Sequence, residues 1–328
     1  MSTAIAVEFD PSLSYLYVVA QDARDAICPV CGAGETAPAR DDVRDFEYFV
    51  RPTRPFGLRR CRRCDSEYLA PRPSGDELPP FYPPEYHAYN EDHGAVASLL
   101  VGVRARLRGR AYRQLLGGRP GRLFDVGAGD CRHFDELRRY CDLECAGVEI
   151  QPAIAARGRA RGYAIEDGML ETMPLDGHES RYDIVSMNHV LEHVIHPGLV
   201  LERALRLLRP GGWLVGQLPA RTSWEARLFG RYWGGYHFPR HLQAFSHAGL
   251  RTALAAAGFV DVKVTAAPHI QTAVSMQNML IGSGWRPRMH FGKSPLYGVM
   301  LLGVLPFESV AWLCGRSGMM NFAARKPS

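Results

Sequence analysis

The chain has 328 residues, of which 46% are hydrophobic, so it is long enough to bury one sizeable core and a smaller attachment. Its 39 Lys and Arg against 34 Asp and Glu leave a formal charge of +5, which is mild and does not demand a nucleic-acid partner. The first 25 residues lack a basic start and acidic residues interrupt their apolar stretches. No secretory signal is visible, and a cytoplasmic location is expected.

Four of the eight cysteines form two CxxC pairs, Cys28 with Cys31 and Cys61 with Cys64. In a reducing compartment, thiols at this spacing are more typical of metal ligands than of disulfides. Two such knuckles can bring four thiolates tetrahedrally around Zn²⁺. The pattern predicts a structural zinc module over residues 1–75, with four free thiols as the plain alternative.

A proline-rich stretch, PRPSGDELPPFYPP at 71–84, follows the module and cannot form a helix interior. The next segment, FYPPEYHAYN, is dense in aromatic residues. We interpret residues 76–97 as a linker and cap, in which Tyr82 and Tyr86 line a substrate pocket. The commoner role of such residues is to dock a linker onto its neighbouring domain.

A basic amphipathic helix is predicted over residues 98–116. Its expected apolar stripe consists of Leu100, Val103, Leu107, Ala111 and Leu115. The simplest role for this helix is to cover the following domain while its arginines face solvent. Contact with an anionic membrane surface or with phosphate backbones is the sharper alternative.

Residues 123–126 predict a short buried strand that leads into a turn at Gly127 and Gly129, with a helix from about Cys131. Glycines in such a turn let a ligand approach the backbone, and the helix N-terminus favours anionic groups. Arg132 stands where a dinucleotide motif would have its third glycine, which disfavours a pyrophosphate ligand.

Further strands are predicted at 144–150, 163–167, 182–188 and 213–219, with helices between them. Another helix and strand follow over about 249–268, and a last strand begins at Asn321. Strands that alternate with helices predict an α/β protein with a doubly wound, mostly parallel sheet.

Four segments together resemble the ordered motifs of class I S-adenosylmethionine (SAM) dependent methyltransferases over about 123–264. They are DVGAGD (125–130), VEI (148–150), DIVSMNHVLEHVIHP (183–197) and LRPGGWLVGQLP (208–219). The chain is most similar to small-molecule methyltransferases related to the ubiquinone O-methyltransferases and to those of glycan and natural-product pathways. Several similar enzymes carry a cysteine-rich zinc module ahead of the catalytic domain. The common loop DVGCGTG differs here at Ala128, Asp130 and Cys131.

The resemblance implies a seven-stranded sheet and a set of SAM contacts. By this resemblance, Asp125 orients the loop and reaches the amino group of the methionine moiety of SAM, and the backbone of Gly127, Ala128 and Gly129 holds the carboxylate of that moiety. Glu149 binds the ribose hydroxyls, and Asn188 closes on the methionine end. Ile150 lies on one side of the adenine, and Met169 and Leu170 lie on the other.

Ligands in such sheets bind beyond the carboxyl ends of the strands, which directs attention to the histidines after the fourth and fifth strands. His193, His237 and His241 are the candidates for acid–base catalysis. Tyr236 and Arg240 are candidates for substrate contact, although Arg240 equally suits a pair with a loop carboxylate. A lone histidine is more often structural than catalytic.

We expect a methyltransferase domain over 98–328 with inserts at about 221–245 and 269–318. The second insert contains a hydrophobic segment at 296–314, whose apolar run is interrupted at Pro306 and is too short to span a bilayer. A pair of buried helices that cover the pocket, a homodimer contact and peripheral contact with the inner membrane surface remain open.

These features predict methyl transfer from SAM to a small-molecule, glycan or lipid-linked acceptor, at an oxygen atom. An RNA methyltransferase that uses the zinc module for RNA binding is an alternative. The small net charge and the segment NHVLEH, which lacks an Asn/Asp-Pro-Pro-aromatic signature, weigh against it. The third alternative is a non-catalytic SAM-binding scaffold.

Overall fold

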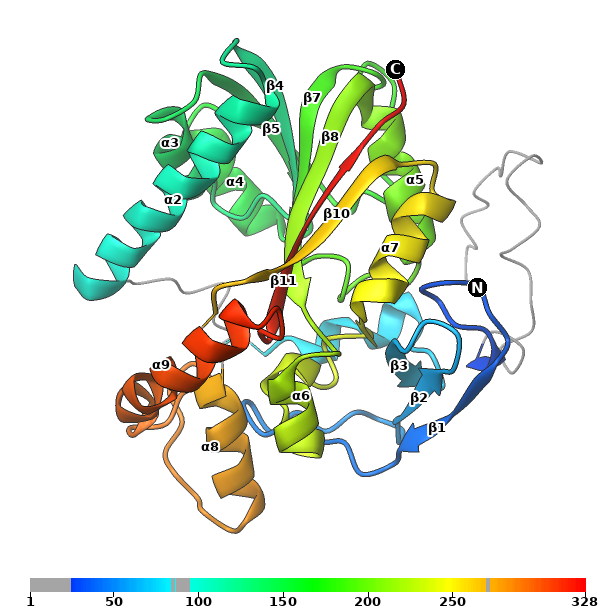
Figure 1. Ribbon diagram of the computed structural model, residues 1–328, viewed down its shortest axis with the longest axis vertical. Helices are drawn as coiled ribbons and strands as arrows, with labels where there is room; N and C mark the ends of the chain where they lie inside the picture. The colour runs from blue at the N-terminus through cyan, green and yellow to red at the C-terminus, as the bar shows by residue number, and fades with distance from the viewer. Residues whose placement is uncertain (1–24, 84–85, 87–94, 270–271) are drawn as a thin grey trace, which may run out of the picture.

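The computed structural model describes residues 25–83, 86, 95–269 and 272–328 (Figure 1). Its centre is a seven-stranded sheet with the strand order β10-β11-β8-β7-β4-β5-β6. Strands β6, β5, β4, β7 and β8 run parallel, and β11 is antiparallel to both of its neighbours. The strands are β4 (Gly121–Val126), β5 (Leu143–Glu149), β6 (Ala164–Asp167), β7 (Tyr182–Asn188), β8 (Leu208–Pro219), β10 (Val260–Ala267) and β11 (Met319–Arg325). The predicted α/β fold, doubly wound and mostly parallel, is confirmed.

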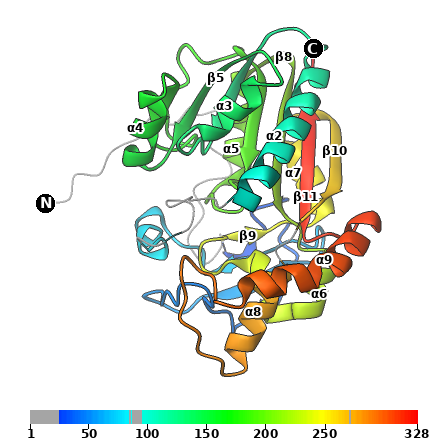
Figure 2. The ribbon, with the colours of Figure 1, turned by 90° about the vertical axis from the view of Figure 1, so that its left-hand side faces the viewer.

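Helices cover both faces of this sheet (Figures 1 and 2). They are α2 (Ala95–Leu115), α3 (Arg132–Arg138), α4 (Pro152–Ala160), α5 (Pro197–Leu207) and α7 (His247–Ala256). Helices α4 and α5 each begin with a proline, a residue suited to the first helical position. In α5, Val200, Leu201, Ala204 and Leu207 form the buried face at helical spacing.

Strand β8 begins five residues before the predicted start at Trp213. Leu208 pairs with Tyr182, and Trp213 pairs with Ile184, so the intervening Arg-Pro-Gly-Gly sequence forms an irregularity in the ladder. The turn-like sequence therefore lies within β8, because the pairing of β8 with β7 resumes after it.

The N-terminal module contributes a small antiparallel sheet of β1 (Thr36–Arg40), β2 (Gly57–Cys61) and β3 (Glu67–Ala70). Its fourth strand is β9 (Gln243–Ala244), which lies more than 170 residues later and pairs with β3. The buried cysteines of the module share one hydrophobic cluster with Phe245 and Leu250 and with residues of the central sheet. The module and the sheet are therefore joined by a continuous core.

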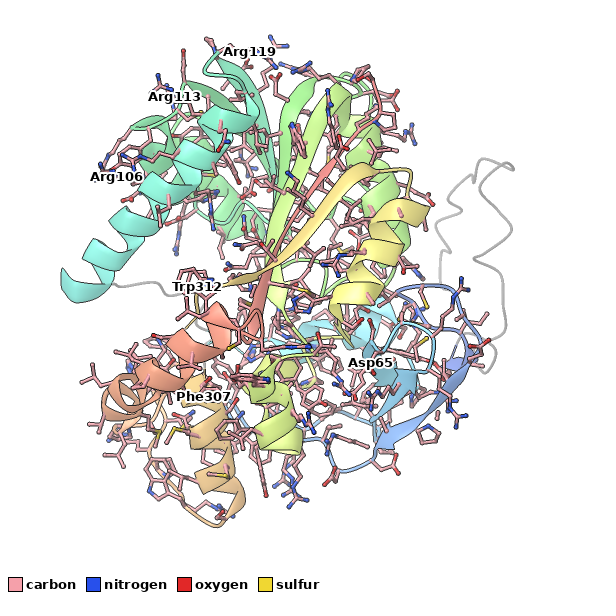
Figure 3. The ribbon with its side chains drawn as sticks, in the orientation of Figure 1. Asp65, Arg106, Arg113, Arg119, Phe307 and Trp312 are labelled. Carbon is pink, nitrogen blue, oxygen red and sulfur yellow. The ribbon has the colours of Figure 1, made fainter. Side chains whose placement is uncertain are left out.

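Within the described side chains of α2, which do not include Leu100 and Val103, the buried face differs from the predicted stripe. Leu107 is 58% exposed, whereas Tyr112 and Leu116 are 5% and 3% exposed. A side chain at Gly109 would collide with Tyr140, so this glycine lets α2 approach the segment that follows α3. The close approach turns the helix so that Tyr112 and Leu116 are buried. Arg106 and Arg113 are exposed, and they can be followed in Figure 3.

The two predicted inserts form a helical group beside the sheet, seen below it in Figure 2. The first contains α6 (Trp224–Phe229) and the short 3-10 helices η5 (Gly230–Tyr232) and η6 (Gly234–Tyr236); the second contains α8 (Thr272–Gly282) and α9 (Tyr297–Leu313). Helix α8 packs against α6, η5 and η6, and α9 packs against α8.

Helix α9 is a single helix that continues through Pro306, the residue at which the apolar run of the sequence is interrupted. The expectation that the apolar segment is buried is only partly met. Val304 is buried, but Val299, Leu302 and Leu313 are at least 70% exposed. No helix within the described part of the chain is both long and apolar enough to cross a membrane.

Candidate active site and zinc site

The turn after β4 has the backbone that its glycines predict. Gly127 and Gly129 have φ angles of 75° and 58°, in the region that disfavours other residues. The N–H groups of Gly127 and Ala128 both donate to the carbonyl of Val148, at 2.8 and 3.0 Å. A side chain at Gly129 would meet nothing within 4 Å, so the outer side of the turn is open. The turn can therefore admit a ligand close to its backbone.

Asp125 lies at the base of this turn and is 4% exposed. The Ser186 hydroxyl donates to its Oδ1, and its Oδ2 lies 2.9 Å from Nε2 of His133. These partners come from β7 and α3. The carboxylate thus connects the glycine turn to the neighbouring strand and to the following helix, which suits the predicted role in orienting the loop.

Glu149 ends β5 and is 8% exposed. Its Oε2 accepts from the Gly129 N–H at 2.9 Å, and its Oε1 accepts from the Gln151 N–H at 3.0 Å. Each carboxylate oxygen has a further acceptor position, so both are able to take a hydroxyl hydrogen bond as well. Glu149 therefore ties the glycine turn to the strand end at which ribose is expected.

The residues predicted around the adenine differ in exposure. Ile150 and Met169 are 56% and 40% exposed, which is unusual for large apolar side chains at a sheet edge. Leu170 is 1% exposed and belongs to the central core, so it packs beneath the exposed residues and does not face a ligand. Asn188 is half-buried at the end of β7. The glycine turn, Glu149 and the exposed apolar pair fit a SAM-sized ligand.

The four N-terminal cysteines converge on one point. Their sulfur atoms all lie within 4.8 Å of one another, with Cys28 Sγ 3.7 Å from Cys64 Sγ and Cys31 Sγ 3.6 Å from Cys61 Sγ. Thiolates about 2.3 Å from a tetrahedral Zn²⁺ would lie about 3.8 Å apart. The four cysteines therefore fit a zinc ion without rearrangement.

The backbone around the cysteines also forms two tight knuckles. The Gly32 N–H donates to the Cys28 carbonyl, and the Asp65 N–H donates to the Cys61 carbonyl. Each donor residue has a positive φ angle. The Ser246 hydroxyl, at the N-cap of α7, donates to the Cys64 carbonyl. The second knuckle is thereby attached to the methyltransferase side of the molecule.

The segment after β7 brings a histidine and a buried glutamate beside the glycine turn. A side chain at Gly127 would lie 3.1 Å from a methyl group of Val190, so this segment faces the turn directly. His189 Nδ1 lies 3.4 Å from Glu192 Oε1. The Glu192 side chain is 1% exposed, whereas that of His189 is 42% exposed. Glu192 can therefore orient an imidazole that remains accessible.

The three predicted catalytic histidines gather next to Glu192. The ring centroid of His241 is 4.5 Å from that of His193 and 5.1 Å from that of His237. Burial lowers the pKa of His193 and lowers the pKa of His241 well below the usual value. Burial also acts to raise the pKa of Glu192, but its contact with His189 and the nearby rings outweigh this and hold that pKa low. These shifts favour an ionised Glu192 beside neutral rings of His193 and His241.

These three histidines are held by the cap, the first insert and the N-terminal module. His193 Nδ1 lies 3.0 Å from the Tyr82 hydroxyl, and His241 Nδ1 lies 2.8 Å from the Gly235 carbonyl. His237 Nδ1 lies 2.8 Å from Glu47 Oε1. The structure brings together the three histidines that the sequence singled out, but sequence analysis missed the carboxylates beside them. Glu192 lies within the quoted motif, whereas Glu47 carries no motif that would have pointed to it.

Arg240, a predicted substrate contact, is 0% exposed. Its guanidinium donates to both carboxylate oxygens of Asp45 at 3.0 Å, and to the carbonyls of Phe81 and Phe238. It also lies over the Tyr48 ring. This geometry supports the alternative of a pair with a loop carboxylate, because a substrate would have to displace Asp45.

The other predicted substrate contacts occupy the same region. Tyr86 is 7% exposed, and its ring packs edge-on against that of Tyr82 at a centroid distance of 5.3 Å. The Tyr236 hydroxyl donates to Glu67 Oε2 at 2.5 Å, which joins η6 to β3. Tyr236 therefore connects the first insert to the zinc module. Tyr82 contacts the histidine cluster at His193, and Tyr86 contacts it at His237, with ring centroids 5.7 Å apart.

Comparison with known proteins assigns the central part of the chain to a family. Residues 102–264 match the family described as "Methyltransferase domain". This segment belongs to that family, and with its seven-stranded sheet and glycine turn it is a class I SAM-dependent methyltransferase domain. The cofactor of this class is SAM.

A curated relative is trans-aconitate 2-methyltransferase from Methylobacterium nodulans, which is 31% identical over 152 residues. The match covers 45% of this chain and 57% of the relative, so it spans only part of that protein. Among solved structures, a SAM-dependent methyltransferase from Archaeoglobus fulgidus is 17% identical with a TM-score of 0.47, covering 69% of this chain and 94% of its own. Phosphoethanolamine N-methyltransferase 2 from Haemonchus contortus is 13% identical, with a TM-score of 0.44. The match covers 68% of this chain and 53% of the Haemonchus contortus chain.

Proposed function

We propose that the protein transfers the methyl group of SAM to an oxygen of a small-molecule, glycan or lipid-linked acceptor. The observation that carries this proposal is the accessible His189, oriented by the buried Glu192 beside the glycine turn. The methyltransferase domain and the relative that acts on a small molecule support the same assignment.

Methyl transfer is an in-line displacement, so the chain's main task is to hold the acceptor at the methyl carbon and exclude water. SAM supplies the methyl group when bound. An acceptor hydroxyl must also lose its proton as its oxygen bonds to the methyl carbon and the carbon–sulfur bond breaks. His189 is the group that we assign to this step.

Glu192 determines how His189 would work. A proton on Nδ1 directed at the carboxylate leaves Nε2 as the acceptor for the hydroxyl proton. The imidazolium that forms is then stabilised by the buried charge of Glu192. His193 and His241 have their pKa values lowered by burial, so they are suited to remain neutral and line the site. His189 thus replaces the three buried histidines as our candidate base.

The enclosure of the site favours a compact acceptor group. The N-terminal module and the first insert meet over the histidine cluster, where a small cavity is lined by Val43, Tyr236 and His241. Tyr82 and Tyr86 close the neighbouring side. An acceptor that extends a hydroxyl into this region fits better than a folded RNA, which would need a broad basic surface.

The test uses methyl-labelled SAM, purified protein and a cell extract, with the label then separated among RNA, lipid, polysaccharide and small-molecule fractions. Label in any of the last three fractions is expected. Label confined to RNA would refute the proposed acceptor class, and binding of SAM without label transfer would indicate a scaffold.

Once an acceptor fraction is known, the proton-transfer role can be tested separately. We expect His189→Gln to reduce kcat at least about 100-fold, within the range attributed to a general base, with SAM affinity retained. Glu192→Gln should also reduce kcat and alter its pH profile. His290→Gln, in the second insert, is the matched control. A His189→Gln variant with unchanged kcat would exclude it as the base.

A further inference from the structure

Three ionisable side chains meet at a second place, within the helical group formed by the inserts. Glu225 comes from α6, His269 from the connection between β10 and α8, and Glu308 from α9. One oxygen or nitrogen atom of each lies within 4.8 Å of the others. The Glu225 and His269 side chains are 2% and 8% exposed, and Glu308 is 3% exposed. Their charges are therefore largely removed from water.

Each carboxylate is held by one oxygen and presents the other. Ser275 donates to Oε1 of Glu225 at 2.5 Å, and Thr272 donates to Oε1 of Glu308 through its hydroxyl at 2.5 Å and its N–H at 3.0 Å. Within the described residues, the Oε2 atoms of both glutamates are buried without a hydrogen-bond partner. The Oε2 of Glu225 lies 3.7 Å from Nε2 of His269. This is the pattern expected when outer hydrogen bonds aim carboxylates at a metal ion.

A glycine keeps the centre of this cluster accessible. A side chain at Gly318 would lie 2.0 Å from Glu225 Oε2 and 3.2 Å from His269 Nε2. Any other residue there would occupy the space in front of these two atoms. The absence of a side chain at position 318 therefore leaves the ligand atoms unobstructed.

The charge of the cluster also calls for a cation. In the described ranges, no lysine or arginine forms an ion pair with Glu225 or Glu308. Burial, with a contribution from Glu308, raises the pKa of Glu225 to about 8. Two buried carboxylates without a cation repel each other, and either a proton or a metal ion can relieve this.

We propose that Glu225 Oε2, His269 Nε2 and Glu308 Oε2 bind a divalent metal ion such as Zn²⁺ or Mn²⁺. One imidazole with two carboxylates suits these borderline and hard cations, and ligand atoms about 2.1 Å from an ion lie about 3.4 Å apart, close to the observed 3.7 Å. The ion ties α9 and the start of α8 to α6. It is separate from the four-cysteine site and from the SAM site.

The ion would also support the wall of the proposed acceptor site. Ser275, which holds Glu225, also accepts a hydrogen bond from the N–H of Gly234 at 2.7 Å. Gly234 begins η6, the short helix that carries Tyr236 toward the zinc module. Binding at the cluster is therefore connected to η6 through the Ser275 hydroxyl.

The test is metal binding by the full-length protein, which does not depend on an acceptor. Mn²⁺ is titrated into protein whose four-cysteine site is saturated with Zn²⁺, and bound Mn²⁺ is counted by electron paramagnetic resonance. We expect one tight Mn²⁺ per chain in the wild type and an affinity at least about 100-fold weaker in Glu308→Gln and Glu225→Gln, as expected for loss of a metal ligand. Glu202→Gln, on α5, is the matched control and should bind as the wild type does.

Thermal unfolding separates a lost ligand from a misfolded variant. Mn²⁺ should raise the Tm of the wild type and of Glu202→Gln, but not that of Glu308→Gln. A Glu308→Gln protein that unfolds cooperatively at or above the Tm of the metal-free wild type is correctly folded, because it has lost one repelling charge. The proposal is wrong if the wild type takes up no Mn²⁺, or if Glu225→Gln and Glu308→Gln bind Mn²⁺ as tightly as the wild type does. The cluster would then be a pair of carboxyl groups that share a proton.

Discussion

The buried pair of Arg240 and Asp45 allows a sharp test of how the N-terminal module is attached. Arg240→Met removes the guanidinium but approximately keeps the length of the side chain. The Asp45 carboxylate would still accept backbone N–H bonds from Glu47, Tyr48 and Val50 at 2.9 to 3.1 Å. Asp45→Ala instead leaves the guanidinium with only two carbonyls and leaves three N–H donors without their acceptor. The two variants should therefore not be equivalent.

Breaking a buried ion pair by removing one partner costs about 3 to 5 kcal/mol. The loss of unfolding free energy for Arg240→Met should lie near the lower end of this range, at about 3 kcal/mol, because the remaining Asp45 carboxylate keeps its backbone N–H donors. Asp45→Ala should cost more than about 5 kcal/mol, because unsatisfied backbone N–H groups add to the unpaired charge. The double variant should be less unstable than the sum, since each single variant already loses the shared contact.

The assay is urea unfolding followed by tryptophan fluorescence and circular dichroism, with the free energy taken from the first transition. Arg231→Met is the matched control: it removes the exposed pair between Arg231 and Asp42 at the same junction, and no measurable change is expected. A loss below about 1 kcal/mol for Arg240→Met, or a larger loss than for Asp45→Ala, would refute the reasoning.

Three further predictions concern the other parts of the molecule. Cys61→Ser should release the zinc of the four-cysteine site, measured by a chromogenic chelator, and lower the first unfolding transition; zinc removal that leaves both melting and methyl transfer unchanged would contradict a structural role. Glu149→Gln should weaken SAM binding at least about tenfold by calorimetry, whereas Glu144→Gln, exposed on the same strand, should not. If the wild type elutes as a homodimer in size-exclusion chromatography, Leu302→Glu, at a position 70% exposed on α9, should convert it to a monomer. Wild-type protein that is monomeric but co-sediments with anionic vesicles would favour membrane contact instead.

Several features could be predicted because they depend on local chemistry. Parallel strands buried on both faces need continuous apolar runs, and the turn at Gly127 and Gly129 needs residues that tolerate positive φ. The CxxC pairs likewise carry their metal-binding chemistry in their spacing. For this reason the sheet, the glycine turn and the four converging cysteines were all anticipated.

The role of charged residues was much less predictable. Arg240 was a candidate for either a substrate contact or a pair with a loop carboxylate, and only the fold shows that Asp45, nearly 200 residues away in sequence, accepts from both of its terminal nitrogens. The partner of an arginine depends on which segments pack together, and a single sequence does not contain that information. The same limit applies to Glu47 beside His237.

Patterns of apolar residues were also ambiguous. On α2, Leu107 and Tyr112 are both apolar enough to be buried, and the close approach permitted by Gly109 decided in favour of Tyr112. On α9, helical packing against one neighbour buries Val304 and leaves Leu302 in solvent. Hydrophobicity indicates that a residue can be buried, whereas its neighbours determine whether it is.

The sequence by itself determined the strand and helix order, the methyltransferase class and the cysteines that can hold zinc. The element order and the cysteine site follow from periodicity, turn chemistry and motif spacing, which act over a few residues. The class follows from the resemblance of four segments to methyltransferase motifs. The tertiary structure alone decided that β3 pairs with β9, that Glu47 faces His237, and that Glu225, His269 and Glu308 meet. Such contacts join segments distant in the chain, and they form only when burial of the shared core brings those segments together.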